Sequence, residues 1–192
     1  PCSEPWSYPS VVGMMMYLAS NSRPDIAFAV YSCARFTHCP KRVHEKALKR
    51  IARYLKATKD RGMIIKPTSD LTMELYVDAD FAGLWGAESP DDSTSVKSRT
   101  GFVITLGGTP VVWSSKLQTE IALSTCESEY IALSTAMRTL LPLRVLFQSL
   151  ATTMKVDREE VIKVCAVWED NNAALKLATA MFPNMTPRTK HI

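Results

Sequence analysis

The sequence lacks the features of a membrane or secreted protein. No stretch approaches the roughly 18 uninterrupted apolar residues that a membrane span needs. The amino terminus has no basic region followed by an apolar run, so no signal peptide is predicted. The 192 residues are 46% hydrophobic and 22% charged, as in one or two globular domains with a sizeable core. We therefore expect an intracellular chain without a membrane partner. Since it does not begin with Met, we expect either a piece of a longer polyprotein or an excised segment.

The placement of the cysteines argues against two further classes of protein. The five cysteines, at positions 2, 33, 39, 126 and 165, are scattered and odd in number. They form no CxxC pair and no Cys/His cluster with zinc spacing, so neither a disulfide framework nor a zinc site is predicted. Reduced thiols in an intracellular protein are expected.

Positive charge is concentrated in one segment. The net charge is only +4, but residues 41–66 hold ten Lys or Arg residues against two acids, Glu45 and Asp60. The rest of the chain therefore carries an excess of negative charge. This asymmetry indicates a basic surface suited to a polyanion beside a more acidic region.

The first third of the sequence has helical periodicity. An apolar helix is predicted over residues 7–20, broken at Arg23-Pro24 because a residue before proline resists helical geometry. Asp25 is expected to cap a second helix that buries Ile26, Phe28, Ala29, Val30 and Cys33. A third helix, from Pro40 to about Thr58, is expected to bury Val43, Ala47, Ile51, Tyr54 and Leu55.

From Met73 the hydrophobic period changes to two. Alternation over residues 73–78 predicts a strand, and a polar loop follows over residues 80–98. Two further strands, 101–106 and 109–114, flank Gly107-Gly108, which is typical of a hairpin turn. Next, Ser124 and Glu127 fit a capping box that opens a helix to about Leu150, kinked or divided at Pro142.

The carboxyl-terminal region completes an α/β pattern. Residues 161–168 are expected to form a buried strand, with Val164, Ala166 and Trp168 on one face. Asp170-Asn171-Asn172 then opens a last helix. The resulting order, βββ–α–β–α, follows a helical segment.

Three acids stand where an α/β sheet gathers its ligands, at strand ends and helix starts. Asp78 ends the first strand, Glu129 lies in the first turns of the long helix, and Asp170 joins the last strand to its helix. Converging carboxylates would repel one another unless they held a cation, and hard oxygen ligands suit Mg²⁺ or Mn²⁺. The alternative is that such acids only cap helices or interact with helix dipoles.

At these residues the sequence resembles the ribonuclease H domain of Ty1/copia-type retrotransposon polyproteins. The resemblance lies in ordered motifs: YVDADFAG (76–83), KSRTGF (97–102), VWSSKLQ (112–118), LSTCESEYIAL (123–133), EDNNAAL (169–175) and RTKHI (188–192). Upstream, VGMMMYL (12–18), RPDIAFAV (23–30) and RIARYL (50–55) resemble the segment that joins this domain to the reverse transcriptase. The resemblance thus implies a connection segment over 1–66 and a ribonuclease H-like domain over 70–192.

The resemblance implies a ribonuclease H-like mixed sheet and cleavage of the RNA strand of RNA–DNA hybrids, leaving a 3′-hydroxyl and a 5′-phosphate. Its catalytic acids fall on Asp78, Glu129 and Asp170, which would bind two Mg²⁺ (or Mn²⁺) ions, without a small-molecule cofactor. Asp80 and Glu127 are the neighbouring rivals of the first two acids. The implied partners are the hybrid and the adjacent reverse transcriptase domain, and the implied location is a cytoplasmic virus-like particle or the nucleus.

One departure from the family pattern concerns the end of the sequence. The family continues into a fifth strand and a helix that bears a fourth carboxylate, and neither follows Ile192 here. We therefore expect a truncated domain whose last strand is an exposed hydrophobic edge, with lower activity than an intact domain.

Other residues have two interpretations each. The basic residues of the third helix could track phosphates of the hybrid without sequence preference, or form a solvated face; these are Arg42, Lys46, Lys49, Arg50 and Arg53. Lys97, Ser98 and Arg99 could touch the hybrid backbone or remain unengaged. His191 is a candidate for proton transfer. The tryptophans are mostly expected in the core.

Two other functions compete with hybrid cleavage. One is a non-catalytic nucleic-acid-binding or spacer remnant of a transposon polyprotein. The other is a carboxylate metal site for cutting DNA, as in resolvase or integrase relatives of the same fold.

Overall fold

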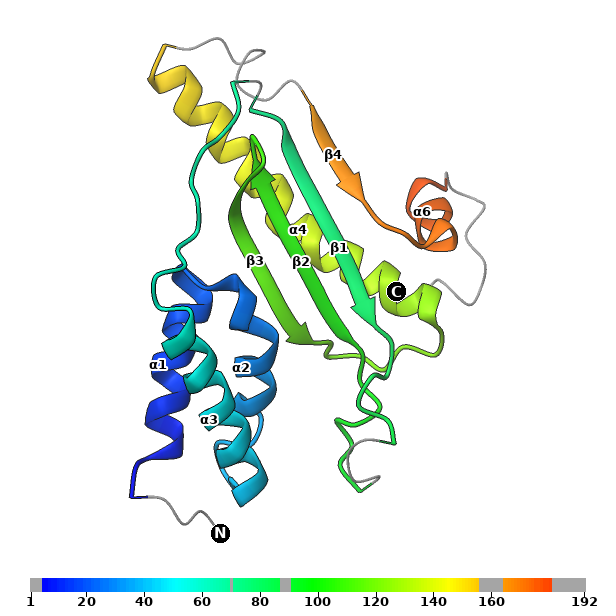
Figure 1. Ribbon diagram of the computed structural model, residues 1–192. Helices are drawn as coiled ribbons and strands as arrows, with labels where there is room; N and C mark the ends of the chain where they lie inside the picture. Colours follow the sequence, from blue (N-terminus) through cyan, green and yellow to red (C-terminus); the bar gives the residue numbers. More distant parts are fainter. Residues whose placement is uncertain (1–4, 70, 87–90, 156–163, 181–192) are drawn as a thin grey trace. The chain divides into compact units, whose positions relative to one another are not determined.

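The computed structural model describes residues 5–69, 71–86, 91–155 and 164–180 (Figure 1). The chain separates into two compact units, Pro1–Ile64 and Ile65–Ile192. The first is helical and the second holds the sheet.

The helical unit contains α1 (Tyr8–Asn21), a 3-10 turn (Pro24–Ile26), α2 (Ala27–Ala34) and α3 (Arg42–Ala57). The Ser7 hydroxyl accepts the Ser10 N–H at the start of α1. Arg23 ties the unit together, since its guanidinium bonds the Asp25 carboxylate at 2.7 Å and the Thr58 hydroxyl at 2.7 Å. The expected helices are therefore present.

Two details of these helices correct the sequence prediction. Asp25 does not cap α2, which begins after Ile26 without a side-chain cap; its carboxylate instead accepts bonds from Arg23 and from the Tyr54 hydroxyl. Phe28, expected inside, is 56% exposed.

The buried side of α3 also differs from the prediction. It runs through Glu45, Leu48 and Ile51, while Val43 and Ala47 are exposed. An acid thus occupies the packed stripe, which a pattern built from apolar residues alone could not identify.

The second unit is a four-stranded mixed sheet with α4 (Thr125–Thr153) across one face (Figure 1). The strands are β1 (Met73–Asp80), β2 (Arg99–Leu106), β3 (Thr109–Leu117) and β4 (Cys165–Trp168), in the order β3-β2-β1-β4. The pairs β1–β2 and β2–β3 are antiparallel, and β1–β4 is parallel. With α6 (Asn172–Thr179) after β4, this arrangement confirms the predicted ribonuclease H-like α/β fold.

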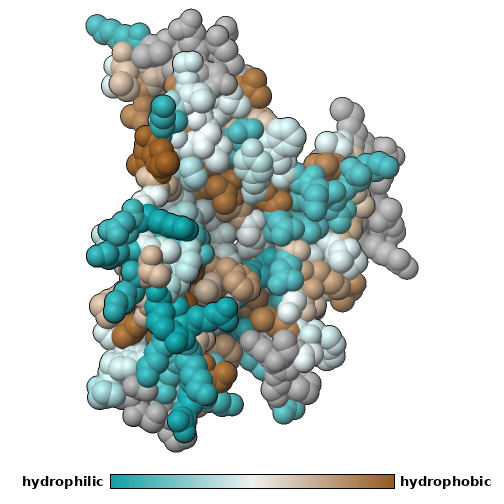
Figure 2. All heavy atoms as spheres, viewed as in Figure 1, coloured by the Kyte–Doolittle hydropathy of each residue, from teal (hydrophilic) through white to brown (hydrophobic). Residues whose placement is uncertain are grey.

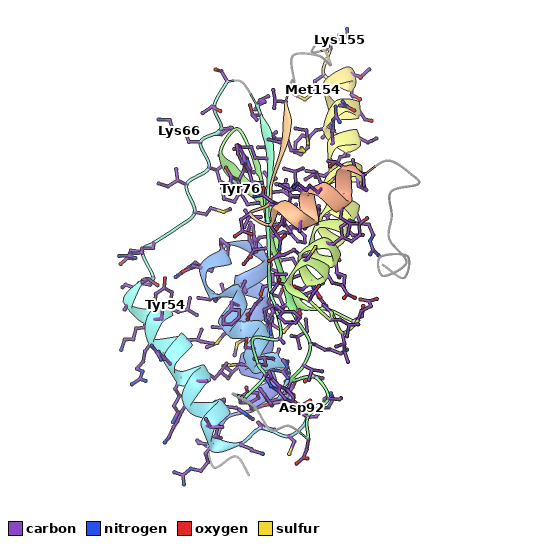
Figure 3. All side chains as sticks on the ribbon, turned by 90° about the vertical axis from the view of Figure 1, so that its right-hand side faces the viewer. Tyr54, Lys66, Tyr76, Asp92, Met154 and Lys155 are labelled. Carbon is purple, nitrogen blue, oxygen red and sulfur yellow. The ribbon has the colours of Figure 1, made fainter. Side chains whose placement is uncertain are left out.

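The core lies between the sheet and α4, as the edge-on view of Figure 3 shows. The residues of β1 that alternate inward contact Ala132, Ala136 and Leu140 of α4. Met73 and Leu75 are fully buried there. The alternation predicted for this strand is confirmed.

Gly107 and Gly108 form the hairpin turn, with φ of 54° and 76°. Both angles lie in the left-handed region, which a two-residue hairpin turn requires and which glycine tolerates. A Cβ at Gly107 would also lie 2.8 Å from the backbone nitrogen of Thr68. The predicted hairpin is therefore confirmed, with a geometric reason for its first glycine.

Helix α4 is continuous through Pro142 rather than divided there. Within the described residues it is long and apolar enough, by length and composition, to cross a membrane. Ala132, Ala136 and Leu140 of this helix are buried in the core with β1 and β2, whereas the part after Leu140 exposes apolar residues such as Val145 and Leu150. Length and composition are thus weak grounds for a membrane span.

The last strand is shorter and less buried than predicted. Within the described residues β4 has four residues, and the expected positions 161–163 lie outside the described part. Cys165 and Val167 face the core, not Val164, Ala166 and Trp168, and Trp168 is 54% exposed. A strand at the edge of the described sheet packs against fewer neighbours. The apolar run alone therefore did not determine which of its side chains face the core. Trp85, also expected inside, is 62% exposed.

We expect Leu75→Ala to lower the free energy of unfolding by about 2–5 kcal/mol, because it removes a fully buried side chain from the core beneath α4. Denaturant unfolding followed by circular dichroism measures the effect. Leu123→Ala, at a position 80% exposed, is the matched control and should change stability by less than about 0.5 kcal/mol. Equal effects of both substitutions would contradict the core assignment.

Candidate metal centre

Parallel pairing of β1 and β4 brings two aspartates to the same end of the sheet. The last paired residues are Tyr76 and Trp168, whose rings stack with centroids 6.3 Å apart. Asp78 and Asp170 each lie two residues beyond this pair. They therefore lie at the same end of the sheet, where the two parallel strands finish.

Glu129 approaches the same edge from the first turns of α4. Its side chain is only 7% exposed, and the backbone N–H of Ala79, next to Asp78, donates to its carboxylate. The other oxygen, Oε2, is buried and has no hydrogen-bond partner in the part of the chain that the structure describes. A buried, unsatisfied carboxylate oxygen is costly unless a ligand completes it.

The three carboxylates converge. Asp78, Glu129 and Asp170 each offer one oxygen, and these oxygens lie within 4.8 Å of one another. This all-oxygen, all-carboxylate set matches the preference of Mg²⁺ or Mn²⁺.

Asp80 and Glu127, the alternative candidates for the first two ligand positions, have other contacts. The Asp80 carboxylate occupies the space that a Cβ at Gly83 would take. The Glu127 carboxylate accepts the Leu123 N–H at 2.9 Å, while the Ser124 hydroxyl accepts the Glu127 N–H. Glu127 therefore serves the start of α4, although its bond goes one residue before the expected capping-box position.

Asp170 does not cap α6, which was the main alternative to a role as a metal ligand. The side chain of Asn171 caps α6 and accepts the N–H groups of Ala173 and Ala174. Asp170 is thus left to join the cluster.

Burial and crowding of like charges raise the pKa of Glu129 to about 7. Burial is the largest cause, followed by the charges of Glu169, Asp78 and Asp170, and the Ala79 N–H opposes them. Burial and the charges of Asp170 and Asp78 likewise raise the pKa of Glu169, against the Asn171 N–H. Without a cation, the site therefore favours proton uptake near neutral pH.

Sequence reasoning overlooked Glu169 and Gln118. Gln118 follows β3, and its amide nitrogen donates to the Thr100 hydroxyl at 3.1 Å and to the Ser128 carbonyl at 2.8 Å. It thereby fixes the first turns of α4, and hence Glu129, to the sheet. A lone polar residue after a strand carries no periodic signal that would have identified it.

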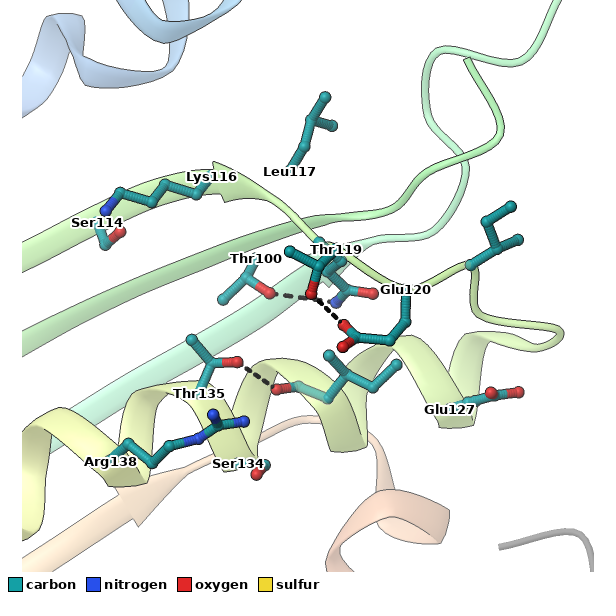
Figure 4. A pocket seen from close by; sticks show the side chains of 13 residues that line it. Thr100, Ser114, Lys116, Leu117, Thr119, Glu120, Glu127, Ser134, Thr135 and Arg138 are labelled. Carbon is teal, nitrogen blue, oxygen red and sulfur yellow. Dashed lines mark hydrogen bonds between the residues drawn. The ribbon is translucent and has the colours of Figure 1, made fainter. Parts of the chain in front are cut away.

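A separate hollow of about 350 Å³ lies beside α4 (Figure 4). It is lined by Lys116, Gln118, Glu120 and Arg138 among others, but by none of the three converging acids. The carboxylate cluster, with Asp78 and Asp170 exposed and Glu129 buried, is thus not part of this hollow.

The residues predicted to bind nucleic acid divide by exposure. Arg42, Lys46, Lys49, Arg50 and Arg53 are all exposed on α3, where Figure 2 shows hydrophilic side chains gathered. Their binding role stays a prediction.

Lys97, Ser98 and Arg99, which lead into and begin β2, are less exposed than the cations of α3. Ser98 is fully buried, with its hydroxyl accepting the Ala82 N–H, and Arg99 is 6% exposed. Neither can present its side chain to a phosphate as placed, which corrects that expectation. Lys97 is half-buried and donates to the Thr119 carbonyl at 2.9 Å. His191 lies outside the described residues.

Comparison with known proteins found transposon relatives. The chain is 39% identical over 128 residues to the retrovirus-related Pol polyprotein from transposon RE1 of Arabidopsis thaliana, covering 67% of the chain and 8% of that protein. It is 36% identical over 185 residues to the corresponding polyprotein from transposon TNT 1-94 of Nicotiana tabacum, covering 96% of the chain and 12% of that protein. The chain belongs to the Ty1/copia-type retrotransposon Pol polyprotein family. It spans about a tenth of the length of these relatives or less.

A third relative is shorter. Secreted RxLR effector protein 161 of Plasmopara viticola is 40% identical over 129 residues, which cover 67% of the chain and 85% of that protein. No protein-family model and no solved structure matches the chain.

The raised pKa of Glu129 predicts a pH-dependent stability in the presence of EDTA. The pKa of about 7 exceeds the ordinary 4.5, so the folded state binds the proton more tightly than the unfolded state. The free energy of unfolding should therefore fall by up to about 3 kcal/mol as pH rises from 4.5 to 7, and stay low above pH 7. Denaturant unfolding from pH 5 to 8 measures this.

Glu129→Gln should remove most of this decline and make the protein more stable than wild type at pH 8. Glu127→Gln, at the cap of α4, is the control and should keep the decline. A Glu129→Gln profile as steep as that of the wild type would contradict the assignment.

Proposed function

We propose that this part of the Pol polyprotein is a metal-dependent endonuclease that cleaves the RNA strand of RNA–DNA hybrids during reverse transcription. The observation that carries the proposal is the convergence of Asp78, Glu129 and Asp170 with a buried, unpartnered oxygen on Glu129. A mere cap or a solvated acid would have no reason to bury such an oxygen.

The donor set fits Mg²⁺ or Mn²⁺, with one carboxylate from each of β1, α4 and the turn after β4. When bound, paired divalent ions activate water and stabilise the leaving oxygen in phosphodiester cleavage. The role of the protein residues is to hold the metal ligands and to orient them. The Ala79 N–H fixes one oxygen of Glu129, and Gln118 fixes the backbone that carries it. No side chain needs to act as a nucleophile.

The proposed partners are the RNA–DNA hybrid and the reverse transcriptase domain of the same polyprotein, to which residues 1–66 would connect. The proposed location is a cytoplasmic virus-like particle or the nucleus. Family membership supports neighbouring domains in the same polyprotein.

Asp78→Asn should lower Mg²⁺-dependent cleavage of a labelled RNA–DNA hybrid at least about 100-fold, because it removes one anionic ligand from the converging set. Asp80→Asn is the matched control, since that carboxylate lies against Gly83, and should retain activity within about threefold. Duplex DNA of the same sequence should not be cut. Full activity of Asp78→Asn would refute the site, and preferential cutting of duplex DNA would refute the substrate.

A second candidate function is nucleic-acid binding without cleavage. The exposed basic face of α3 favours it, because five cations on one helix suit a sugar-phosphate backbone. The two functions are compatible, and the binding face lies in the helical unit while the carboxylates lie in the sheet unit.

Replacing Lys46 and Arg53 together by Gln should weaken hybrid binding. It should also reduce the slope of log affinity against log salt by about 1–2, because fewer phosphate contacts form on binding and fewer counterions are therefore released. Fluorescence anisotropy between 50 and 200 mM salt measures the slope. Lys59→Gln, which removes an exposed cation beyond the end of α3, serves as the control. An unchanged slope in the double variant would mean that the face is only solvated.

A further inference from the structure

Glu169 has an unusual position for an acid outside the converging set. It lies in the turn between β4 and α6, directly before Asp170. Its Oε1 accepts the Asn171 N–H at 3.1 Å, while its Oε2 is buried without a hydrogen-bond partner. One oxygen therefore has a structural role, and the second has none within the described residues.

A structural role alone does not explain a carboxylate here. The bond to Asn171 needs a single acceptor, which a neutral Gln side chain supplies equally well. A second, charged oxygen without a partner carries a desolvation cost.

The surroundings of Glu169 are acidic. Among the charges that act on Glu129, that of Glu169 is the strongest, ahead of Asp78 and Asp170. Two buried oxygens, Glu129 Oε2 and Glu169 Oε2, thus lack hydrogen-bond partners among the described residues, and the charge of the Glu169 carboxylate acts on that of Glu129. Glu129 is more than nine-tenths buried and its carboxylate belongs to the converging set. Two unsatisfied acceptors beside further carboxylates are the environment of a cation.

We propose that Glu169 is a fourth carboxylate of the metal centre and supplies an oxygen to a second divalent cation. The inference rests on the proposed function. Glu169 is outside the group whose oxygens lie within 4.8 Å of one another, so it serves a neighbouring ion rather than the one that those three share.

Mn²⁺ binding to the full 192-residue chain tests this role by isothermal titration calorimetry and by the electron paramagnetic resonance signal of free Mn²⁺. The wild type should bind two ions. Glu169→Gln should bind the first within about threefold of the wild-type affinity and the second at least tenfold more weakly. Glu127→Gln is the matched control and should bind both ions like the wild type.

The test separates this inference from the proposed function. No Mn²⁺ binding by the wild type would remove both. Two ions bound equally well by the wild type and by Glu169→Gln would overturn the role of Glu169 and leave the three-carboxylate site intact.

A thermal melt shows whether misfolding of Glu169→Gln, and not the loss of a metal ligand, causes weaker Mn²⁺ binding. In EDTA, Glu169→Gln should melt at or above the wild-type temperature, because it keeps the acceptor for Asn171 and removes one repelling charge. Saturating Mn²⁺ should then raise its melting temperature less than that of the wild type. If Glu169→Gln melts lower in EDTA, while both proteins gain equally from Mn²⁺, Glu169 is only structural.

Discussion

The parallel pairing of β1 with β4 is the constraint on which the site depends. It brings Asp78 of β1 and Asp170 of the turn after β4 to the same end of the sheet, each two residues past the Tyr76–Trp168 pair. An antiparallel β4 would send Asp170 to the opposite end of the sheet. The chain reaches β4 by way of α4, and that connection lets Glu129 meet both aspartates from the helix that covers β1.

This convergence opposes the stability of the sheet unit. Burial and like charges raise the pKa of both Glu129 and Glu169, so each ionised carboxylate weakens the fold in the absence of a cation. The core between the sheet and α4 must offset that cost. Groups held in such unfavourable states are characteristic of functional sites, where a ligand supplies the missing interaction.

Much of the fold could be predicted because local chemistry determined it. Strict alternation identified β1, the glycine pair identified the hairpin, and Ser124 identified the start of α4. Predictions failed where tertiary contacts chose between local options. Asp25, for example, does not cap α2, because its carboxylate accepts hydrogen bonds from Arg23 and from the Tyr54 hydroxyl.

The candidate site shows the same division. Its three acids were predicted from strand and helix ends, but Glu169 was missed, since the burial of one oxygen cannot be read from a sequence. Every acid of the centre comes from β1, α4 or the turn after β4, which pack on one core within the sheet unit. The cations of α3 belong to the helical unit. The carboxylates proposed for catalysis and the cations proposed for binding a polyanion therefore belong to different units. A relative could lose one of these functions and keep the other.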